Sequence, residues 1–167
     1  MRGLNRVAPS TIGMTICEAF SPLIGMTDER PAPRTRRGCW DSESFVNPSG
    51  MTVFRLGSFE FRHASDDDVG QTAQASMRAT DVLINIVDVT ATEAGATNPY
   101  YRPLPLPLTV DGSHAVQQEG YEAPAAVIRG VRIDAHSFYL SVAFGSAAPS
   151  DAQVAAADAV LRTLTVR

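Results

Sequence analysis

The segment at residues 81–90 constrains the fold more than any other part of the chain. Its sequence, Asp-Val-Leu-Ile-Asn-Ile-Val-Asp-Val-Thr, is aliphatic at six of ten positions. Successive side chains of a β-strand point to opposite faces of the sheet, so a strand this apolar needs cover on both faces. The segment therefore predicts a central strand, and it disfavours a sheet with one face in water.

Two further strands are predicted at residues 125–134 and 136–144. Almost nothing separates them, which indicates a hairpin with a tight turn near Asp134 and Ala135. The second strand alternates, with one set of side chains apolar and the other mostly small or polar. The first set is Phe138, Leu140, Val142 and Phe144, and the second is Ser137, Tyr139, Ser141 and Ala143.

The chain ends in a predicted helix. Ser150 is followed three residues later by Gln153, which is a capping-box pattern, and Asp151 suits the positive end of the helix dipole. Apolar side chains at helical spacing predict a face that packs on the sheet. They are Val154, Ala157, Leu161 and Leu164.

Residues 51–62 predict an irregular strand. Phe54 and Leu56 fall on one face, whereas Phe59 and Phe61 follow in the opposite register. A β-bulge at Gly57–Ser58 would return all four side chains to one core face.

Two weaker elements complete the prediction. A short helix is expected near residues 71–78, with Asp68 as its cap. Residues 102–108, Arg-Pro-Leu-Pro-Leu-Pro-Leu, predict an edge strand, because three prolines in phase leave one side of the strand without donors. A polyproline II ligand is the alternative, but the Pro-x-x-Pro spacing is absent.

The chain divides into two unlike segments. Residues 1–50 hold five of the 11 prolines and both cysteines, Cys17 and Cys39, without a sustained helix or strand period. These cysteines form either a disulfide or two free thiols, and no Cys-x-x-Cys spacing decides between them. Residues 51–167 carry the predicted elements. We therefore expect an irregular or partly disordered arm over 1–50. The domain at 51–167 is predicted to be α+β, with an antiparallel sheet of about five strands and a C-terminal helix packed on it.

Composition excludes several function classes. All 14 basic residues are arginine, so chemistry that needs a lysine, such as a Schiff base or a phosphate-loop nucleotide site, is ruled out. A net charge of −4 argues against nucleic-acid binding. No apolar run approaches the ~20 residues that span a bilayer, and no clear signal peptide is present. The default expectation is therefore a cytoplasmic protein without a membrane span.

Two groups of residues could support catalysis or metal binding. The first is His63 with Asp66 and Asp68, where an imidazole and carboxylates lie in one polar run. The second is Ser113 with His114, which follows Asp111 and Gly112. A solvated loop accounts for the first group and a turn accounts for the second, since catalytic triads assemble from separate elements. We therefore assign no catalytic residue, no metal site and no cofactor.

Aromatic residues suggest a binding surface instead. Tyr100, Tyr101 and Tyr121 lie near strand ends, with Arg102 beside them, and Trp40 is a further candidate. Tyrosine rings give a large contact area at low cost in conformational entropy. Ordinary packing at the ends of strands is the alternative.

The pattern of residues 51–167 resembles the PsbP-like domains, which are small α/β sandwiches. The resemblance lies in Phe54 to Phe61, Val82 to Val89, the strand Phe138-Tyr-Leu-Ser-Val-Ala-Phe144, and the closing Leu161-Arg-Thr-Leu-Thr-Val166. It implies an extracytoplasmic domain that binds proteins or acts as an accessory piece.

Three functions are therefore open. The first is a non-enzymatic binding or accessory domain that acts on a protein partner. The second is a hydrolase or metal-dependent enzyme that uses the His/Asp or Ser/His group. The third is a domain that self-associates through a sheet edge or through the N-terminal arm.

Overall fold

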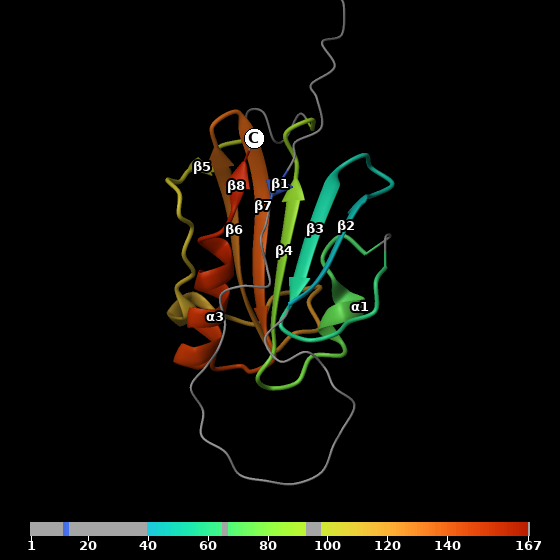
Figure 1. Ribbon diagram of the computed structural model, residues 1–167, viewed down its shortest axis with the longest axis vertical. Helices are drawn as coiled ribbons and strands as arrows, with labels where there is room; N and C mark the ends of the chain where they lie inside the picture. The colour runs from blue at the N-terminus through green and yellow to red at the C-terminus, as the bar shows by residue number, and fades with distance from the viewer. Residues whose placement is uncertain (1–11, 14–39, 65–66, 93–97, 167) are drawn as a thin grey trace, which may run out of the picture.

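A computed structural model of the chain describes residues 12–13, 40–64, 67–92 and 98–166. Its centre is a six-stranded sheet in the order β2-β3-β4-β7-β6-β5 (Figure 1). The strands are β2 (Asp41–Val46), β3 (Thr52–Gly57), β4 (Val82–Asp88), β5 (Arg102–Pro103), β6 (Ala125–Ile133) and β7 (His136–Phe144). All neighbours are antiparallel except β5 and β6, which are parallel. The predicted α+β class is confirmed, with six strands in place of about five.

The two strongest strand predictions are confirmed. β4 lies between β3 and β7, and residues 81–87 are all buried. β6 and β7 form a hairpin in which Ile133 pairs with His136. Asp134 occupies the left-handed region in the turn, at φ 53°, which aspartate tolerates better than most residues.

The predicted closing helix is α3 (Asp151–Leu161), and its capping box is confirmed. Ser150 Oγ accepts a hydrogen bond from the Gln153 amide (3.3 Å), and the Ser150 amide donates to Gln153 Oε1 (3.0 Å). Ala157, Leu161 and the following Leu164 are buried against the sheet, as predicted. Within the described residues, no helix has the length and apolar character that crossing a bilayer requires.

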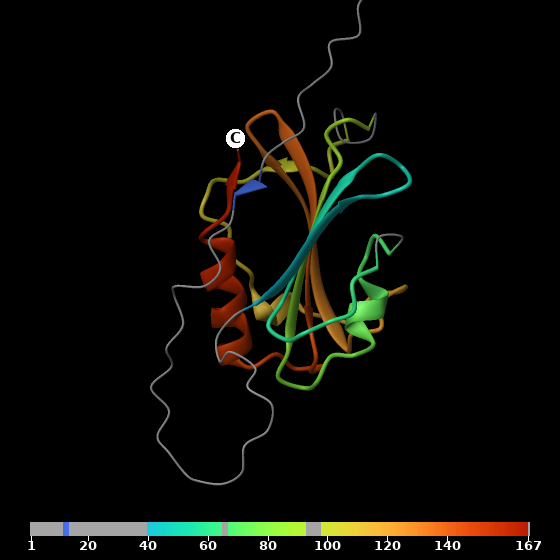
Figure 2. The same cartoon turned by 45° about the vertical axis from the view of Figure 1, so that its right-hand side comes forward.

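The sheet has two unlike faces. Figure 2 shows that α3 lies on one face and α1 (Gln71–Gln74) on the other. We call the first the helix-side face. Its core includes Ile84, Ile86, Leu140, Val142 and Leu161. We call the second the loop-side face. It carries two smaller apolar clusters, one around Leu83 and Ala126 and one around Val53 and Val87.

The sheet begins before the predicted boundary at residue 50. β2 lies before that boundary and forms a full ladder with β3, from Asp41–Gly57 to Val46–Thr52. Two more residues of the predicted arm form β1 (Ile12–Gly13), which pairs with β8 (Thr165–Val166). Polar alternation in Asp-Ser-Glu-Ser-Phe-Val conceals an edge strand, because one face of β2 is exposed. Cys17 and Cys39, like most of the arm, lie outside the described residues.

The predicted β-bulge is also wrong. β3 ends at Gly57 with a regular ladder, and the pair Phe54 and Leu56 packs on the opposite face of the sheet from Phe59 and Phe61. Phe54 packs on the helix-side core, whereas Phe59 and Phe61 belong to the loop-side cluster around Leu83. The phase change reflects a chain that leaves the strand and turns back over the other face. Gly57 permits this turn, because a Cβ there would press on the Phe61 ring.

The two weaker predictions need correction. α1 spans four residues and its N-cap is Gly70, while the Asp67 carboxylate, in place of Asp68, accepts from the amides of Gln71 (2.9 Å) and Thr72 (2.7 Å). The predicted strand at 102–108 is at the sheet edge, but β5 ends at Pro103. Proline removes the donors that a longer ladder would need.

Candidate functional site

Four tyrosines gather on the loop-side face. We call Tyr100, Tyr101, Tyr121 and Tyr139 the tyrosine patch. Tyr139 comes from β7, and its neighbour on β6 is Gly130. Gly130 leaves room for the ring of Tyr100, which a Cβ at this position would strike. Because Gly130 of β6 has no side chain, the ring of Tyr100 can therefore pack directly on the sheet.

The patch combines ring contacts with a hydroxyl pair. Tyr100 and Tyr101 meet edge to face, with centroids 5.3 Å apart and planes at 86°. Tyr121 Oη and Tyr139 Oη are 3.2 Å apart, at hydrogen-bonding distance. Tyr101 is buried, Tyr121 and Tyr139 are half-buried, and Tyr100 is 46% exposed. The patch is thus anchored at one end and open at the other.

Burial raises the pKa of two phenols of the patch, those of Tyr139 and Tyr100. It raises the pKa of Tyr139 far above the usual value, and the hydrogen bond with Tyr121 raises this pKa further. Burial also raises the pKa of Tyr100, with smaller effects from Tyr101 and Tyr121. At neutral pH these hydroxyl groups remain uncharged donors and acceptors.

The predicted aromatic surface is thus partly assembled. Tyr100, Tyr101 and Tyr121 lie together, and Tyr139 is an addition. Its signal was present in the sequence, because the tight hairpin turn already sets Tyr139 opposite Gly130. Arg102 lies in β5 and pairs with Val131, a residue of the helix-side core. Paired residues of neighbouring strands start toward the same face of the sheet, so the Arg102 side chain starts toward the helix-side face, away from the patch. Trp40 packs on the helix-side core and does not belong to the patch.

Beside the patch, four buried polar side chains hold the loop at residues 67–70 on the sheet. We call Asn47, Arg55, Gln74 and Asn85 the polar clamp. Asn85 Nδ2 donates to the Asp68 carbonyl (2.7 Å), Gln74 Nε2 to that of Val69 (2.7 Å), and Arg55 to that of Asp67. Asn47 Nδ2 donates to the Asp68 carboxylate (2.9 Å). The clamp thus fixes the segment that leads into α1.

The clamp is centred on a buried ion pair. Arg55 is fully buried and pairs with Glu43 of β2, whose side chain is 8% exposed. The Arg55 guanidinium also lies 5.4 Å from the Phe45 ring. Arg55 Nε and Asn85 Oδ1 are buried and have no hydrogen-bond partner among the described residues. The network is therefore incompletely satisfied, which lowers its contribution to stability.

The predicted His/Asp group does not form one site in the part that the structure describes. His63 Nε2 lies 3.4 Å from Asp41 Oδ2, and His63 Nδ1 lies 3.7 Å from Glu43 Oε2. Because different ring nitrogens face the two carboxylates, one ion could not bind all three groups. Asp68 is engaged by Asn47. Asp66 lies outside the described residues, and the described residues contain no cluster of three metal-ligating side chains.

The predicted Ser/His pair is arranged as a turn. Ser113 Oγ donates to Asp111 Oδ1 (2.7 Å), and His114 Nδ1 lies 3.0 Å from Asp111 Oδ2. Hydrogen bonds from Ser113 lower the pKa of the Asp111 carboxyl, with a smaller effect from His114. The hydroxyl thus bonds to the carboxylate and not to the imidazole, which is the opposite of a catalytic triad. These residues form η1 (Gly112–His114), capped by Asp111.

The third histidine differs from its expected exposure. His136 opens β7 beside the turn, where we expect an exposed side chain, but its side chain is only 17% exposed. Its Nδ1 lies 3.8 Å from Asp88 Oδ2, and the ring stacks on Phe138 at 6.0 Å.

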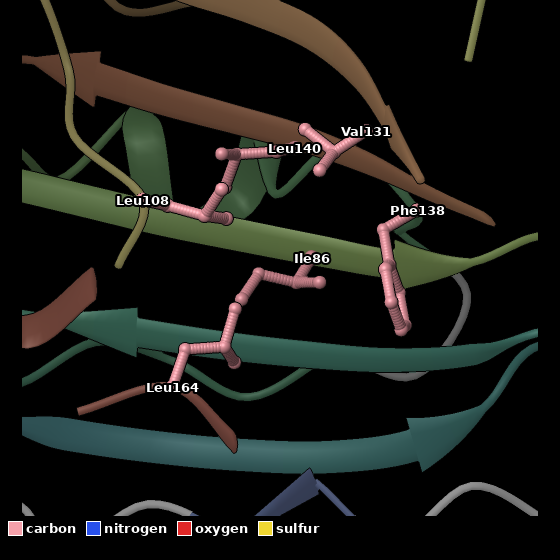
Figure 3. A pocket seen from close by; sticks show the side chains of 6 residues that line it. All are labelled: Ile86, Leu108, Val131, Phe138, Leu140 and Leu164. Carbon is pink, nitrogen blue, oxygen red and sulfur yellow. The ribbon is translucent and has the colours of Figure 1, made fainter. Parts of the chain in front are cut away.

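A small apolar pocket lies on the helix-side face (Figure 3). It is lined by six aliphatic or aromatic side chains, Ile86, Leu108, Val131, Phe138, Leu140 and Leu164. With no polar side chain in its walls, it cannot orient a ligand by hydrogen bonds. We interpret it as imperfect packing between the sheet and the segment that carries Leu108.

Comparison of the sequence with protein-family models, with curated proteins and with solved structures gives no match. The function is therefore argued from the surface itself.

Proposed function

We propose that this chain is a non-enzymatic binding domain and that the tyrosine patch contacts a protein partner. The observation that carries the proposal is the position of Tyr100. Its ring is seated over Gly130 but remains 46% exposed. A large aromatic side chain that is held in place and open to solvent is typical of the centre of a protein interface.

The chemistry of the patch favours a protein over a charged ligand. The rings supply apolar contact area, and the hydroxyls of Tyr121 and Tyr139 supply hydrogen bonds. Tyrosine is enriched at protein interfaces for this combination of properties. The partner's matching surface would therefore be apolar with a few exposed donors or acceptors.

The alternative enzyme has less support. Its residues His63 and Asp68 serve to hold loop and strand segments, and Ser113 and His114 both bond to Asp111. These groups also lie apart in the fold, since His63 is beside β2 whereas Gly112, next to Ser113, packs on Val154 of α3. The proposal therefore assigns these side chains to local structure.

A relationship to PsbP-like domains belongs to the same proposal. It rests on the order of the apolar segments in the sequence of residues 51–167. An extracytoplasmic location and an accessory role would follow from that relationship.

Crosslinking in lysate of the source cells tests the proposal. The full chain would be compared with Tyr100→Ala and with a control of similar exposure, Val116→Ala, whose side chain is 54% exposed. We expect the wild type and V116A to capture the same protein and Y100A to lose at least about 2 kcal/mol of binding, or roughly thirtyfold in affinity. Equal capture by Y100A would refute the proposal.

A further inference from the structure

The two edges of the sheet are unequal. At the β5 edge, Pro103, Pro105 and Pro107 are all exposed, and a proline nitrogen cannot donate to a further strand. At the other edge, β2 offers six residues without a proline and has no neighbour beyond it among the described strands. From this difference we propose that β2 pairs antiparallel with β2 of a second copy of this chain. The interface would be separate from the tyrosine patch.

The backbone of β2 shows which groups are available. The Asn47 amide donates to the Met51 carbonyl (2.9 Å) one step beyond the β2–β3 ladder, in line with the hydrogen-bonded pairs of that ladder. Such pairs alternate along antiparallel strands, so Glu43 and Phe45 also point their amides toward β3. Ser42, Ser44 and Val46 must then point theirs outward. In agreement, the Ser42 amide bonds to its neighbour, the Asp41 carboxylate (2.9 Å).

One register uses all of these outward groups. When Ser44 faces Ser44 of the second copy, Ser42 faces Val46, and all three outward residues fall in hydrogen-bonded pairs. In this register Glu43 lies opposite Phe45, so no two carboxylates face each other. A shift of two residues would set Glu43 against its own copy, and like charges directly opposite are destabilising. Charge thus disfavours that shift, and among the two-residue shifts the register centred on Ser44 is the one that uses all three outward residues.

Side-chain exposure supports the same surface. Ser42 and Ser44 are exposed, and Val46 is 64% exposed, the largest value among the large apolar residues described. The charge of Glu43 is already balanced by the buried Arg55. The second copy would therefore cover apolar surface without burying an unpaired charge.

The blocked β5 edge limits the size of the assembly. A twofold β2–β2 contact is self-complementary, so each copy uses the same surface once. The outer edges of the resulting sheet are then two β5 edges, where Pro103 has no amide donor. Growth stops at a dimer instead of continuing into a fibre.

Disulfide trapping tests the register in the full chain. The variant Ser44→Cys would be oxidised in a background in which Cys17 and Cys39 are serine. Hydrogen-bonded antiparallel pairs have Cα atoms about 5.5 Å apart, which suits a disulfide. We expect a covalent dimer from S44C. The matched control Ser42→Cys should stay monomeric, because about four residues, or ~13 Å, separate the two copies of residue 42. Equal trapping of both variants, or of neither, would overturn the register.

Light scattering tests the dimer itself. We expect the wild type to approach twice the 17.9 kDa of the chain as its concentration rises. Ser44→Pro removes an outward donor but no donor to β3, so it should weaken dimerisation roughly tenfold or more while the circular dichroism spectrum is kept. A wild type that stays at 17.9 kDa at every concentration would refute the proposal.

Discussion

The two faces of the sheet are closed by different means. On the helix-side face, the 11 residues of α3 bury an apolar core, and Leu161, Val142 and Ile84 are almost inaccessible to solvent. On the loop-side face, α1 has four residues, and polar side chains replace much of the apolar contact. A buried arginine and asparagine occupy paired positions in the middle of this face, at Arg55 and Asn85.

This difference separates stability from binding. Burial of apolar area on the helix-side face is non-directional and tolerant of small shifts. The polar clamp is directional, so it holds the loop at residues 67–70 in one position and leaves the neighbouring tyrosine patch partly uncovered. We infer that the helix-side face supplies most of the stability and that the loop-side face supplies the binding surface.

The largest effect is expected at the centre of the clamp. Arg55→Met leaves Glu43 buried without its cation, and breaking a buried ion pair from one side costs about 3–5 kcal/mol. Removing the charge on both sides, with Arg55→Met and Glu43→Gln together, should recover most of that loss. Urea unfolding of the three proteins measures the coupling. A double variant as unstable as R55M would show that the loss is not one of unpaired charge.

A core truncation on the helix-side face should behave differently. Leu161→Ala removes a fully buried side chain and should cost about 2–5 kcal/mol of unfolding free energy. No second substitution of a polar group should rescue it, because the loss comes from a cavity. Thermal unfolding measures this change. Partner capture by the folded fraction should stay at the wild-type level, and a loss of capture there would contradict the division between faces.

A matched pair of glycine variants sharpens the contrast. Gly130→Ala would strike the Tyr100 ring on the loop-side face, and Gly112→Ala would strike Val154 on the helix-side face. Both overpack, so each should cost about 1–3 kcal/mol. Affinity for the captured partner should fall in G130A alone, because only that variant displaces Tyr100. Equal affinities would indicate that the seat of Tyr100 does not matter for binding.

The smallest effect is expected at alkaline pH. The raised pKa of Tyr139 means that the folded state holds the phenol proton more tightly than the unfolded chain does. This contribution to stability is complete below the unfolded pKa of about 10 and is lost as the pH rises above it. Unfolding free energies at pH 9 and 11 should therefore fall more steeply for the wild type than for Tyr139→Phe. Parallel slopes would contradict the burial of this hydroxyl.

Much of the helix-side face could be predicted from the sequence, because its signals are local and apolar. The run at 81–90, the short turn at Asp134 and the Ser150–Gln153 cap each correspond to an observed element. β2 escaped prediction because an edge strand with one exposed face reads as polar. The opposite register of Phe59 and Phe61 led to the wrong prediction of a β-bulge. The spacing of residues in a sequence does not show that the chain has crossed to the other face of the sheet.

The loop-side face was less predictable because its contacts join distant residues. Three of the four tyrosines of the patch could be named from the sequence, but the seat at Gly130 depends on the pairing of two strands. The clamp joins Asn47 and Arg55 to residues 67–68, and no local pattern marks those polar residues as buried.

One pair of measurements on Tyr100→Ala tests the central claim most directly. Unfolding free energy and affinity for the captured partner would be determined on the same preparation as the wild type. Because Tyr100 is 46% exposed, we predict a stability change within about 1 kcal/mol together with a loss of at least about 2 kcal/mol in binding. Wild-type affinity, or a loss of stability as large as that of L161A, would contradict the account.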